Sequence, residues 1–253
     1  MSTDKDWEKW GSSDPYFGVL SADQFRGRTL GAKQMDEFFA TGQAHVDGIM
    51  RLIHRHFDAE FRPGRSLDFG CGVGRILVPL AGCSGSAVGV DISPSMRAEA
   101  EKNCMERGIG NVSLVGSDDD VAQAEGEFDL VHSHIVFAHI PFKRGRRIIS
   151  ALAGKVSGGG YLAIQILSAC NAPAAKRGLV RLAYRVPLAN IARNIVRGRP
   201  ALEPPMQLHD YHLPSILMDL SSAGFASSLV VPDRFPSGDF DSAMILARRE
   251  RSP

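Results

Sequence analysis

Compact apolar runs alternate with segments of helical periodicity through the middle of the chain, from residue 65 to residue 167. A short continuous apolar run is typical of a buried strand, whereas apolar residues that recur every three or four positions are typical of a helix on a sheet. The predicted strands lie at 66–69, 87–90, 112–117, 128–133 (running on into 135–141) and 161–167. Their alternation with helices predicts a parallel sheet joined by right-handed crossovers.

Further elements flank this core on both sides. Apolar positions within 36–53 recur at helical spacing, so we expect residues 1–62 to form a helical cap that packs on the sheet. A closing helix and two closing strands are predicted at 213–223, 226–231 and 242–247. We therefore divide the chain into a cap at 1–62 and a domain at 63–253 that carries a basic helical lid at about 168–210.

The charge of the chain is balanced, with 29 Lys and Arg against 28 Asp and Glu, which does not favour a nucleic acid as partner. No apolar run approaches the roughly 20 residues that cross a bilayer, so we expect no transmembrane segment. The start of the chain lacks the apolar core of a signal peptide. The four cysteines show neither metal-ligand nor redox spacing, which predicts a reducing, cytoplasmic location.

The most informative stretch is 66–75, where an acid and three glycines follow the first predicted strand. Gly70, Gly72 and Gly74 alternate after Asp68, and an apolar helical segment comes next. Glycine is required in such a turn because a β-carbon would block either the turn or the approach of a ligand. The order of strand, glycine turn and helix offers bare backbone to a nucleotide-like ligand.

The spacing of these glycines argues against a dinucleotide. The pyrophosphate fingerprint has glycine at its first, third and sixth positions, but counting from Gly70 the sixth position is Arg75. Asp68 would repel a pyrophosphate and would suit a ligand that carries an ammonium group. A nucleotide-dependent oxidoreductase is therefore the weaker alternative.

A second acid ends the next predicted strand. The apolar run 87–90 stops at Asp91, and a helix opens directly afterwards. A carboxylate at the end of a second strand can accept two hydrogen bonds from a ribose diol. Taken together, residues 67–74 resemble the first motif, and residues 89–93 the second motif, of the class I methyltransferases that use S-adenosylmethionine.

This resemblance implies an α/β fold with a Rossmann-like, seven-stranded, mostly parallel sheet, flanking helices, an N-terminal helical cap and a helical insertion after strand 5. It also implies S-adenosylmethionine as the cofactor. The residues that it places at the cofactor within this core are Asp68, Gly70, Cys71, Gly72, Gly74, Arg75, Asp91, Ile92, Met96, Asp118, Asp119 and Ser133. In the family an acid after the third strand accepts from the adenine amino group. Asp118 is the better match, with Asp119 as the alternative register and a solvated acidic turn as the other interpretation.

Two positions in the cap are further candidates for cofactor contact. The segments around Tyr16 and Gly42 resemble the capping elements of small-molecule methyltransferases, which fold over the mouth of the cofactor site. Tyr16 could lie near the sulfonium, because a cation beside an aromatic face is favoured by roughly 0.5 to 2 kcal/mol. The alternatives are plain packing of Tyr16 onto the core and a helix bend or close approach at Gly42.

Histidines are the candidates for catalysis. Methyl transfer from a sulfonium needs an oriented acceptor and, for a hydroxyl acceptor, removal of a proton. Histidine suits this task near neutral pH, and we select His139 and His209 as equal candidates for the base. A catalyst that only orients its acceptor is the alternative to both. No acidic ligand accompanies His132, His134 and His139, so we expect no metal site.

The lid is the least typical part of the chain. It contains seven Lys and Arg residues and no acid before Glu203. Three interpretations stay open: a lid that supplies cations to an acidic acceptor, a basic amphipathic surface over 176–199 that contacts anionic membrane, and a solvated helical cap.

The expected activity is methyl transfer to a small-molecule, sugar or lipid-linked acceptor, with a hydroxyl oxygen as the methylated atom. A nucleic-acid acceptor is not expected, because the chain carries no recognition motif for one. The remaining alternative is a module that binds the cofactor without turnover. The acceptor's identity and the oligomeric state stay open.

Overall fold

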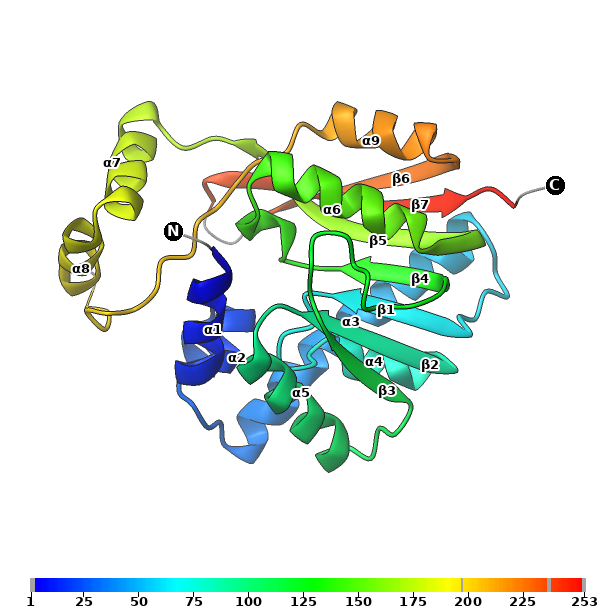
Figure 1. Cartoon of the computed structure of the whole chain (residues 1–253), viewed down its shortest axis with the longest axis horizontal. Coiled ribbons are helices and arrows are strands. Elements are labelled where there is room, and N and C mark those ends of the chain that lie inside the picture. The colour runs from blue at the N-terminus through cyan, green and yellow to red at the C-terminus, as the bar shows by residue number, and fades with distance from the viewer. Residues whose placement is uncertain (1–2, 197, 236–237, 252–253) are drawn as a thin grey trace.

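The structure is a computed structural model that describes residues 3–196, 198–235 and 238–251. A seven-stranded sheet with the order β3-β2-β1-β4-β5-β7-β6 forms its centre (Figure 1). Its strands are β1 (Arg65–Phe69), β2 (Ser86–Asp91), β3 (Val112–Gly116), β4 (Phe128–Ser133), β5 (Val156–Cys170), β6 (Phe225–Arg234) and β7 (Phe240–Arg249). Neighbours pair in parallel except β7, which is antiparallel to both β5 and β6. The predicted mostly parallel, Rossmann-like α/β sheet is confirmed.

Helices cover both faces of this sheet (Figure 1). They are α1 (Thr3–Ser13), α2 (Pro15–Val19), α3 (Ala32–His56), α4 (Leu77–Cys83), α5 (Pro94–Glu106), α6 (Phe142–Gly154), α7 (Ala174–Arg185), α8 (Pro187–Val196) and α9 (Leu213–Ser222), with short 3-10 helices η1 (Asp23–Phe25) and η2 (Phe137–His139). On one face, α3 packs against the sheet through Val46, Ile49 and Ile53. On the other face, α6 and α9 bury a second apolar cluster.

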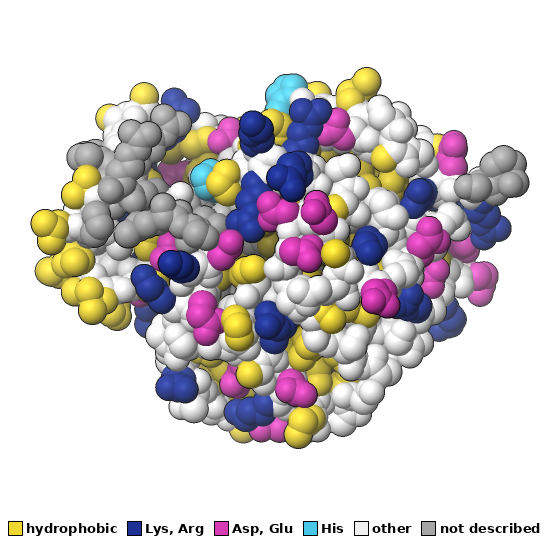
Figure 2. All heavy atoms as spheres, viewed as in Figure 1, with side chains coloured by type: hydrophobic (Ala, Val, Ile, Leu, Met, Phe, Trp, Pro, Cys, Tyr) yellow, Lys and Arg dark blue, Asp and Glu magenta, His cyan; other side chains and the backbone are white. Residues whose placement is uncertain are grey.

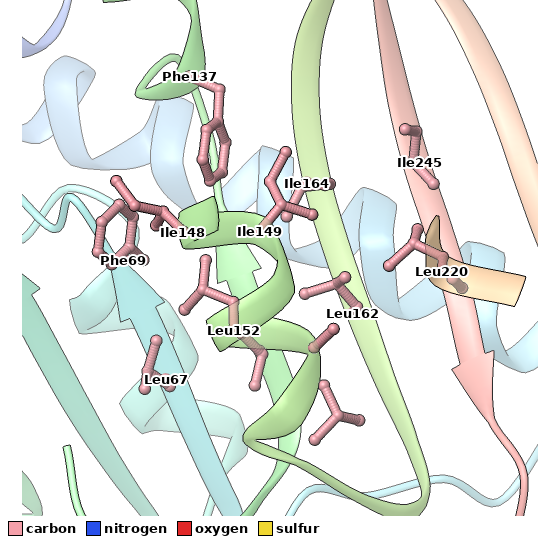
Figure 3. Packing of buried hydrophobic residues seen from close by; sticks show 14 of the residues in the cluster. Leu67, Phe69, Phe137, Ile148, Ile149, Leu152, Leu162, Ile164, Leu220 and Ile245 are labelled. Carbon is pink, nitrogen blue, oxygen red and sulfur yellow. The ribbon is translucent and has the colours of Figure 1, made fainter. Parts of the chain in front are cut away.

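The cluster beneath α6 holds the carboxyl ends of the central strands in place (Figure 3). Leu67 of β1, Leu152 of α6 and Leu162 of β5 are fully buried there. Burying each such side chain stabilises the fold by about 1.5–3 kcal/mol. This packing gives the loops that follow the strands a rigid support.

Two stretches differ from the predicted boundaries. β5 begins at Val156 and runs through 158–160, where the sequence predicted a turn, because Val156 pairs with Phe128 across an irregularity in the β4–β5 ladder. The apolar stretch after β4 does not continue as a strand. Its backbone turns at Ile135, which has φ of +65°, and then enters η2. The chain thereby leaves the sheet at the edge where the site lies.

The cap packs directly on the glycine turn and on α5. Its aromatic cluster includes Trp10, Tyr16 and Phe38, and it encloses Val73 of the turn and Met96 of α5. The helices α7 and α8 stand apart from the sheet, and residues 199–210 then run back past the cap (Figure 1). We call residues 199–210 the return segment; Arg197 of the predicted lid lies outside the described residues.

Candidate functional site

The glycine turn after β1 has the backbone that only glycine adopts readily. Gly70, Gly72 and Gly74 have φ of +74°, +53° and +90°. A β-carbon at Gly70 would lie 2.2 Å from Val136 Cγ2, and one at Gly72 would lie 2.4 Å from Val19 Cγ2. The predicted need for bare backbone is therefore real, although the neighbours that require it belong to the protein itself.

A cavity of about 100 Å³ lies beside this turn, at the carboxyl ends of β1, β2 and β4. Among the predicted cofactor residues, those that line it are Gly70, Gly72, Asp91, Ile92 and Met96. The predicted base His139 lines it as well. Further lining residues that the sequence reasoning missed include Trp7, Val19, Ser117 and His134. The cavity therefore joins the two sequence motifs to the end of β4 and to the cap.

Asp91 is buried, with 8% of its surface exposed, and both carboxylate oxygens are held by backbone. Gly72 N–H donates to Oδ2 over 2.9 Å, and Ser93 N–H donates to Oδ1 over 2.8 Å. Burial raises the pKa of Asp91, although these two backbone donors oppose the change. Each oxygen retains a further lone pair, so the group can still accept from a diol.

Asp68 faces away from the cavity lining, toward α3. His132 Nδ1 donates to Asp68 Oδ1 over 2.9 Å, and His45 Nε2 lies 2.9 Å from His132 Nε2. The other oxygen, Oδ2, is buried without a hydrogen-bond partner. An orphaned carboxylate oxygen calls for a donor or a cation, which leaves the predicted ammonium contact open to test.

Arg75 and Gly42 form a buried junction between the turn and α3. Arg75 is 4% exposed; its Nη2 donates to His134 Nδ1 over 2.9 Å and its Nη1 to Thr41 Oγ1 over 3.3 Å. A β-carbon at Gly42 would lie 1.9 Å from the Arg75 carbonyl oxygen. The structure thus gives Gly42 the close-approach role, and neither residue lines the cavity.

Cys71 and Gly74 have packing roles in the turn. The Cys71 side chain lies in an apolar cluster with Leu77 and Ala87. Burial raises the pKa of its thiol well above the usual range, so the thiol stays neutral. Gly74 faces Ala100 of α5, 3.6 Å from where its β-carbon would be. Both residues shape the turn from outside the cavity.

The acids after β3 lie next to the cavity without lining it. Asp118 Oδ1 accepts from the N–H groups of Asp120 and Ala122, which fixes the turn. Asp119 Oδ1 accepts from Arg144 Nε over 2.7 Å. Ser117, one residue earlier, lines the cavity instead. The adenine contact of Asp118 or Asp119 stays a prediction, and Ser117 becomes a further candidate.

The end of β4 supplies the wall opposite the turn. Ser133 is fully buried, and its hydroxyl donates to the Phe69 carbonyl, whereas the next three residues line the cavity. Ile135 N–H donates to Gln165 Oε1 over 3.1 Å. This contact accompanies the positive φ at Ile135, an unfavoured conformation for a β-branched residue.

The cap covers the cavity through α1 and α2. Trp7 contacts the His139 ring edge to face, with 4.9 Å between ring centroids. Tyr16 lies outside the lining; its hydroxyl donates to Glu99 Oε1 over 2.7 Å and its ring packs edge-on to Phe38. In this structure Tyr16 therefore joins the cap to α5, which is the plain-packing alternative, while Trp7 holds the position beside the cavity.

The two candidate bases have different surroundings. His139 Nδ1 lies 2.8 Å from the carbonyl oxygen of Gln207 in the return segment. Burial lowers the pKa of His139 to about 4, so the ring is neutral at neutral pH. His209 does not line the cavity, and its Nε2 is buried without a partner. Only His139 of the two meets the space in which an acceptor could bind.

Neither a metal nor a membrane span is indicated in the part of the chain that the structure describes. Within it, no group of three His, Cys, Asp or Glu side chains could hold a metal ion. No helix in the same ranges is long and apolar enough to cross a membrane.

Comparison with known proteins gives the class. Residues 67–160 match a family model described as a methyltransferase domain. This part of the chain, which holds the glycine turn, Asp91 and the cavity wall at β4, is similar to that family. The match confirms the methyltransferase domain that the motifs predicted.

Curated relatives match a part of the chain. Aklanonic acid methyltransferase of Streptomyces sp. (strain C5) is 45% identical over 74 residues, which cover 26% of this chain and 32% of that relative. Nocamycin O-methyltransferase of Saccharothrix syringae is 40% identical over 85 residues, covering 32% of this chain and 30% of that relative. The chain thus spans about a third of the length of these relatives.

Solved structures match over nearly the whole chain. The N-methyltransferase NodS of Bradyrhizobium japonicum, in complex with S-adenosyl-L-homocysteine, has a TM-score of 0.61 at 13% identity, covering 98% of this chain and 99% of that one. Magnesium protoporphyrin IX methyltransferase of Synechocystis PCC 6803, with bound SAH, has a TM-score of 0.59 at 21% identity, covering 94% and 98%. At such identities the likeness shows the fold alone.

Proposed function

We propose that this protein is an S-adenosylmethionine-dependent methyltransferase that methylates a hydroxyl oxygen of a small molecule. The observation that carries the proposal is one continuous cavity with Gly70, Gly72 and Asp91 at one side and His139 at another. A cofactor supplies an electrophilic methyl group on a sulfonium, and the chain supplies the groups that hold and orient it. The curated relatives named above are methyltransferases of small molecules, which supports the same acceptor class.

The residues present fit this cofactor. Asp91 offers free lone pairs for a ribose diol, and Gly70 and Gly72 of the turn line the cavity beside it. Asp68, which lies behind the cavity lining, has a buried side-chain oxygen, Oδ2, without a hydrogen-bond partner. We place the adenine near Ser117 and the acids that follow it, and the methionine end near the glycine turn and Asp68.

His139 is the base in this proposal. A carbonyl oxygen only accepts, so the 2.8 Å contact with Gln207 fixes the proton of the neutral ring on Nδ1. Nε2 therefore keeps its lone pair and can take a proton from an acceptor hydroxyl. A base with a pKa of about 4 works best on an acidic hydroxyl, such as a phenol, an enol or a carboxylic acid.

Calorimetric titration with S-adenosylmethionine, and separately with NADH, tests the cofactor. We expect micromolar binding of the first and no response to the second. Radiolabelled methyl transfer to hydroxylated acceptors then tests turnover. Binding without transfer to any acceptor would favour a non-catalytic binding module, and binding of NADH alone would favour an oxidoreductase.

We also propose that α8 and the residues after it contact an anionic membrane, where a lipid-linked acceptor could be met. Seven large apolar residues are exposed in the described ranges, and five of them lie between residues 186 and 202: Val186, Leu188, Ile195, Val196 and Leu202. Figure 2 shows this apolar surface over α8, away from the sheet. The same region of the sequence has cations and no acid, which suits anionic lipid headgroups. Among the cations of the predicted lid, Lys176 forms an ion pair with Asp239, and Arg199 forms one with Glu203.

Vesicle sedimentation tests this contact. The protein should sediment with anionic phosphatidylglycerol vesicles and much less with phosphatidylcholine vesicles. Leu188→Ser combined with Val196→Ser should release it, whereas Met105→Ser, which removes an equally exposed apolar side chain from α5, should not. Equal sedimentation of all variants would contradict the proposal.

The division into a cap at 1–62 and a domain at 63–253, and the cytoplasmic location, remain proposals as well.

A further inference from the structure

Two histidines line the cavity, and their neighbours give them opposite hydrogen-bonding character. Arg75 Nη2 lies 2.9 Å from His134 Nδ1. A guanidinium can only donate, so His134 Nδ1 accepts and a neutral His134 must carry its proton on Nε2. Burial lowers the pKa of His134 well below its usual range, with the neighbouring His45 and Arg75 acting in the same direction, so the ring is neutral. His134 therefore presents an N–H donor.

His139 is the reverse case. Its Nδ1–H donates a hydrogen bond to the Gln207 carbonyl oxygen, so its Nε2 presents a lone pair. Within the described ranges, Nε2 of His134 and Nε2 of His139 have no hydrogen-bond partner. Neither atom belongs to the set of fully buried polar side-chain atoms without a partner. Both atoms therefore keep some exposed surface, and both rings line the cavity.

The donor character of His134 is firmly set. Arg75 is nearly fully buried, and burial lowers its pKa only to about 10, so it stays charged at neutral pH. Thr41 holds its other terminal nitrogen, and the tight contact of α3 at Gly42 keeps its backbone in place. The His45 ring lies 4.0 Å from the His134 ring, centroid to centroid, which limits rotation. The arrangement is rigid enough to select a ligand.

We propose that the acceptor presents two neighbouring oxygens to this pair: a hydroxyl that donates to His139 Nε2 and is methylated, and a second oxygen that accepts from His134 Nε2. Phenols, enols and acids with an adjacent carbonyl or hydroxyl have this pattern. The inference rests on the proposed function. The hydroxyl proton passes to His139 Nε2 as the oxygen bonds to the methyl carbon, and the electron pair of the broken carbon–sulfur bond stays on sulfur.

Isomeric acceptors test the proposal. Catechol carries its second hydroxyl beside the first, whereas hydroquinone carries the same two groups far apart. We expect kcat/KM to favour the first by about tenfold, as for one well-placed hydrogen bond. His134→Phe removes the donor and should abolish the preference while the Kd of S-adenosylmethionine is unchanged. His134→Gln, which restores an N–H donor, should recover part of it.

The outcomes separate the two proposals. Methyl transfer without preference for the adjacent isomer would overturn the inference but leave the methyltransferase standing. A loss of S-adenosylmethionine affinity in His134→Phe would also overturn it, because His134 would then serve the cofactor. If neither isomer is methylated, their dissociation constants are compared in the presence of S-adenosylhomocysteine, and equal binding or none contradicts the inference. Failure to bind S-adenosylmethionine would instead contradict the proposed function.

Discussion

The two sides of the cavity are built in different ways. The side at the glycine turn is made by residues close in sequence, and its polar contacts are largely backbone amides held on Asp91. The side at β4 is made by side chains from distant parts of the chain, where Gln207 fixes His139 and Arg75 fixes His134. The first arrangement suits a constant cofactor, and the second can change with the acceptor. Substitutions should therefore affect cofactor affinity on one side and turnover on the other.

The largest effect should come from the side at β4. His139→Gln removes the lone pair that accepts the proton while keeping a side chain of similar size, and we expect kcat to fall by about a hundredfold or more. The Kd of S-adenosylmethionine from calorimetry should stay the same. His209→Gln should cost far less, because His209 does not line the cavity. A larger loss in His209→Gln would reverse our choice of base.

On the opposite side, Gly70→Ala should weaken S-adenosylmethionine binding by about 2 to 3 kcal/mol. The reason is the positive φ at Gly70 and the 2.2 Å approach of its β-carbon to Val136. Gly110→Ala is the matched control, since its β-carbon would have no neighbour within 4 Å. If both variants bind equally well by calorimetry, the turn is not the cofactor site.

Asp91→Ala should weaken the same affinity by roughly 1 to 3 kcal/mol, the cost of lost charged hydrogen bonds. The change also leaves the N–H groups of Gly72 and Ser93 without their acceptor. Asp91→Asn keeps an acceptor oxygen and should lose less. Unchanged calorimetric affinity in both variants would exclude Asp91 as the ribose contact.

A further effect, on a different quantity, is the dependence of stability on pH. Burial lowers the folded-state pKa of His139 to about 4 and of His45 to about 2, whereas the unfolded chain titrates near 6.5. Below pH 6.5 the unfolded state binds protons that the folded state does not bind. Each histidine therefore lowers the free energy of unfolding by about 1.4 kcal/mol per pH unit until its folded pKa is reached. Thermal melts should show Tm falling from pH 6.5 to 4. His139→Gln should make that fall shallower, and an unchanged slope would contradict the assignment.

The sequence predicted the fold well because the signals were local. Each parallel strand was a compact apolar run, and the glycine turn and Asp91 followed their strands directly. The glycines at 158–160 were assigned to a turn, whereas they lie within β5, in the irregularity of the β4–β5 ladder between the paired residues Val156 and Tyr161. The roles of Gly42 and Tyr16 became clear only from the three-dimensional structure, since each contacts a segment far along the chain.

The site was predicted only on its local side. Ser117 directly precedes the predicted acid Asp118, and this position was the only sequence signal that it lines the site. Trp7 and His134 gave no such signal, because their roles depend on contacts with His139 and Arg75 respectively. His139 and His209 looked alike in sequence. Only the fold shows that the first meets the cavity.

The return segment also holds the proton of His139 on one ring nitrogen. Gln207, which keeps the His139 proton on Nδ1, lies four residues after Glu203, and Arg26 of the cap donates to Glu203 Oε2 over 2.8 Å. Any movement that opens this segment to admit an acceptor would also release the His139 ring from its fixed tautomer. His139 would then be ready to accept a proton only while the return segment is closed, because the Gln207 carbonyl oxygen fixes its tautomer only in that state.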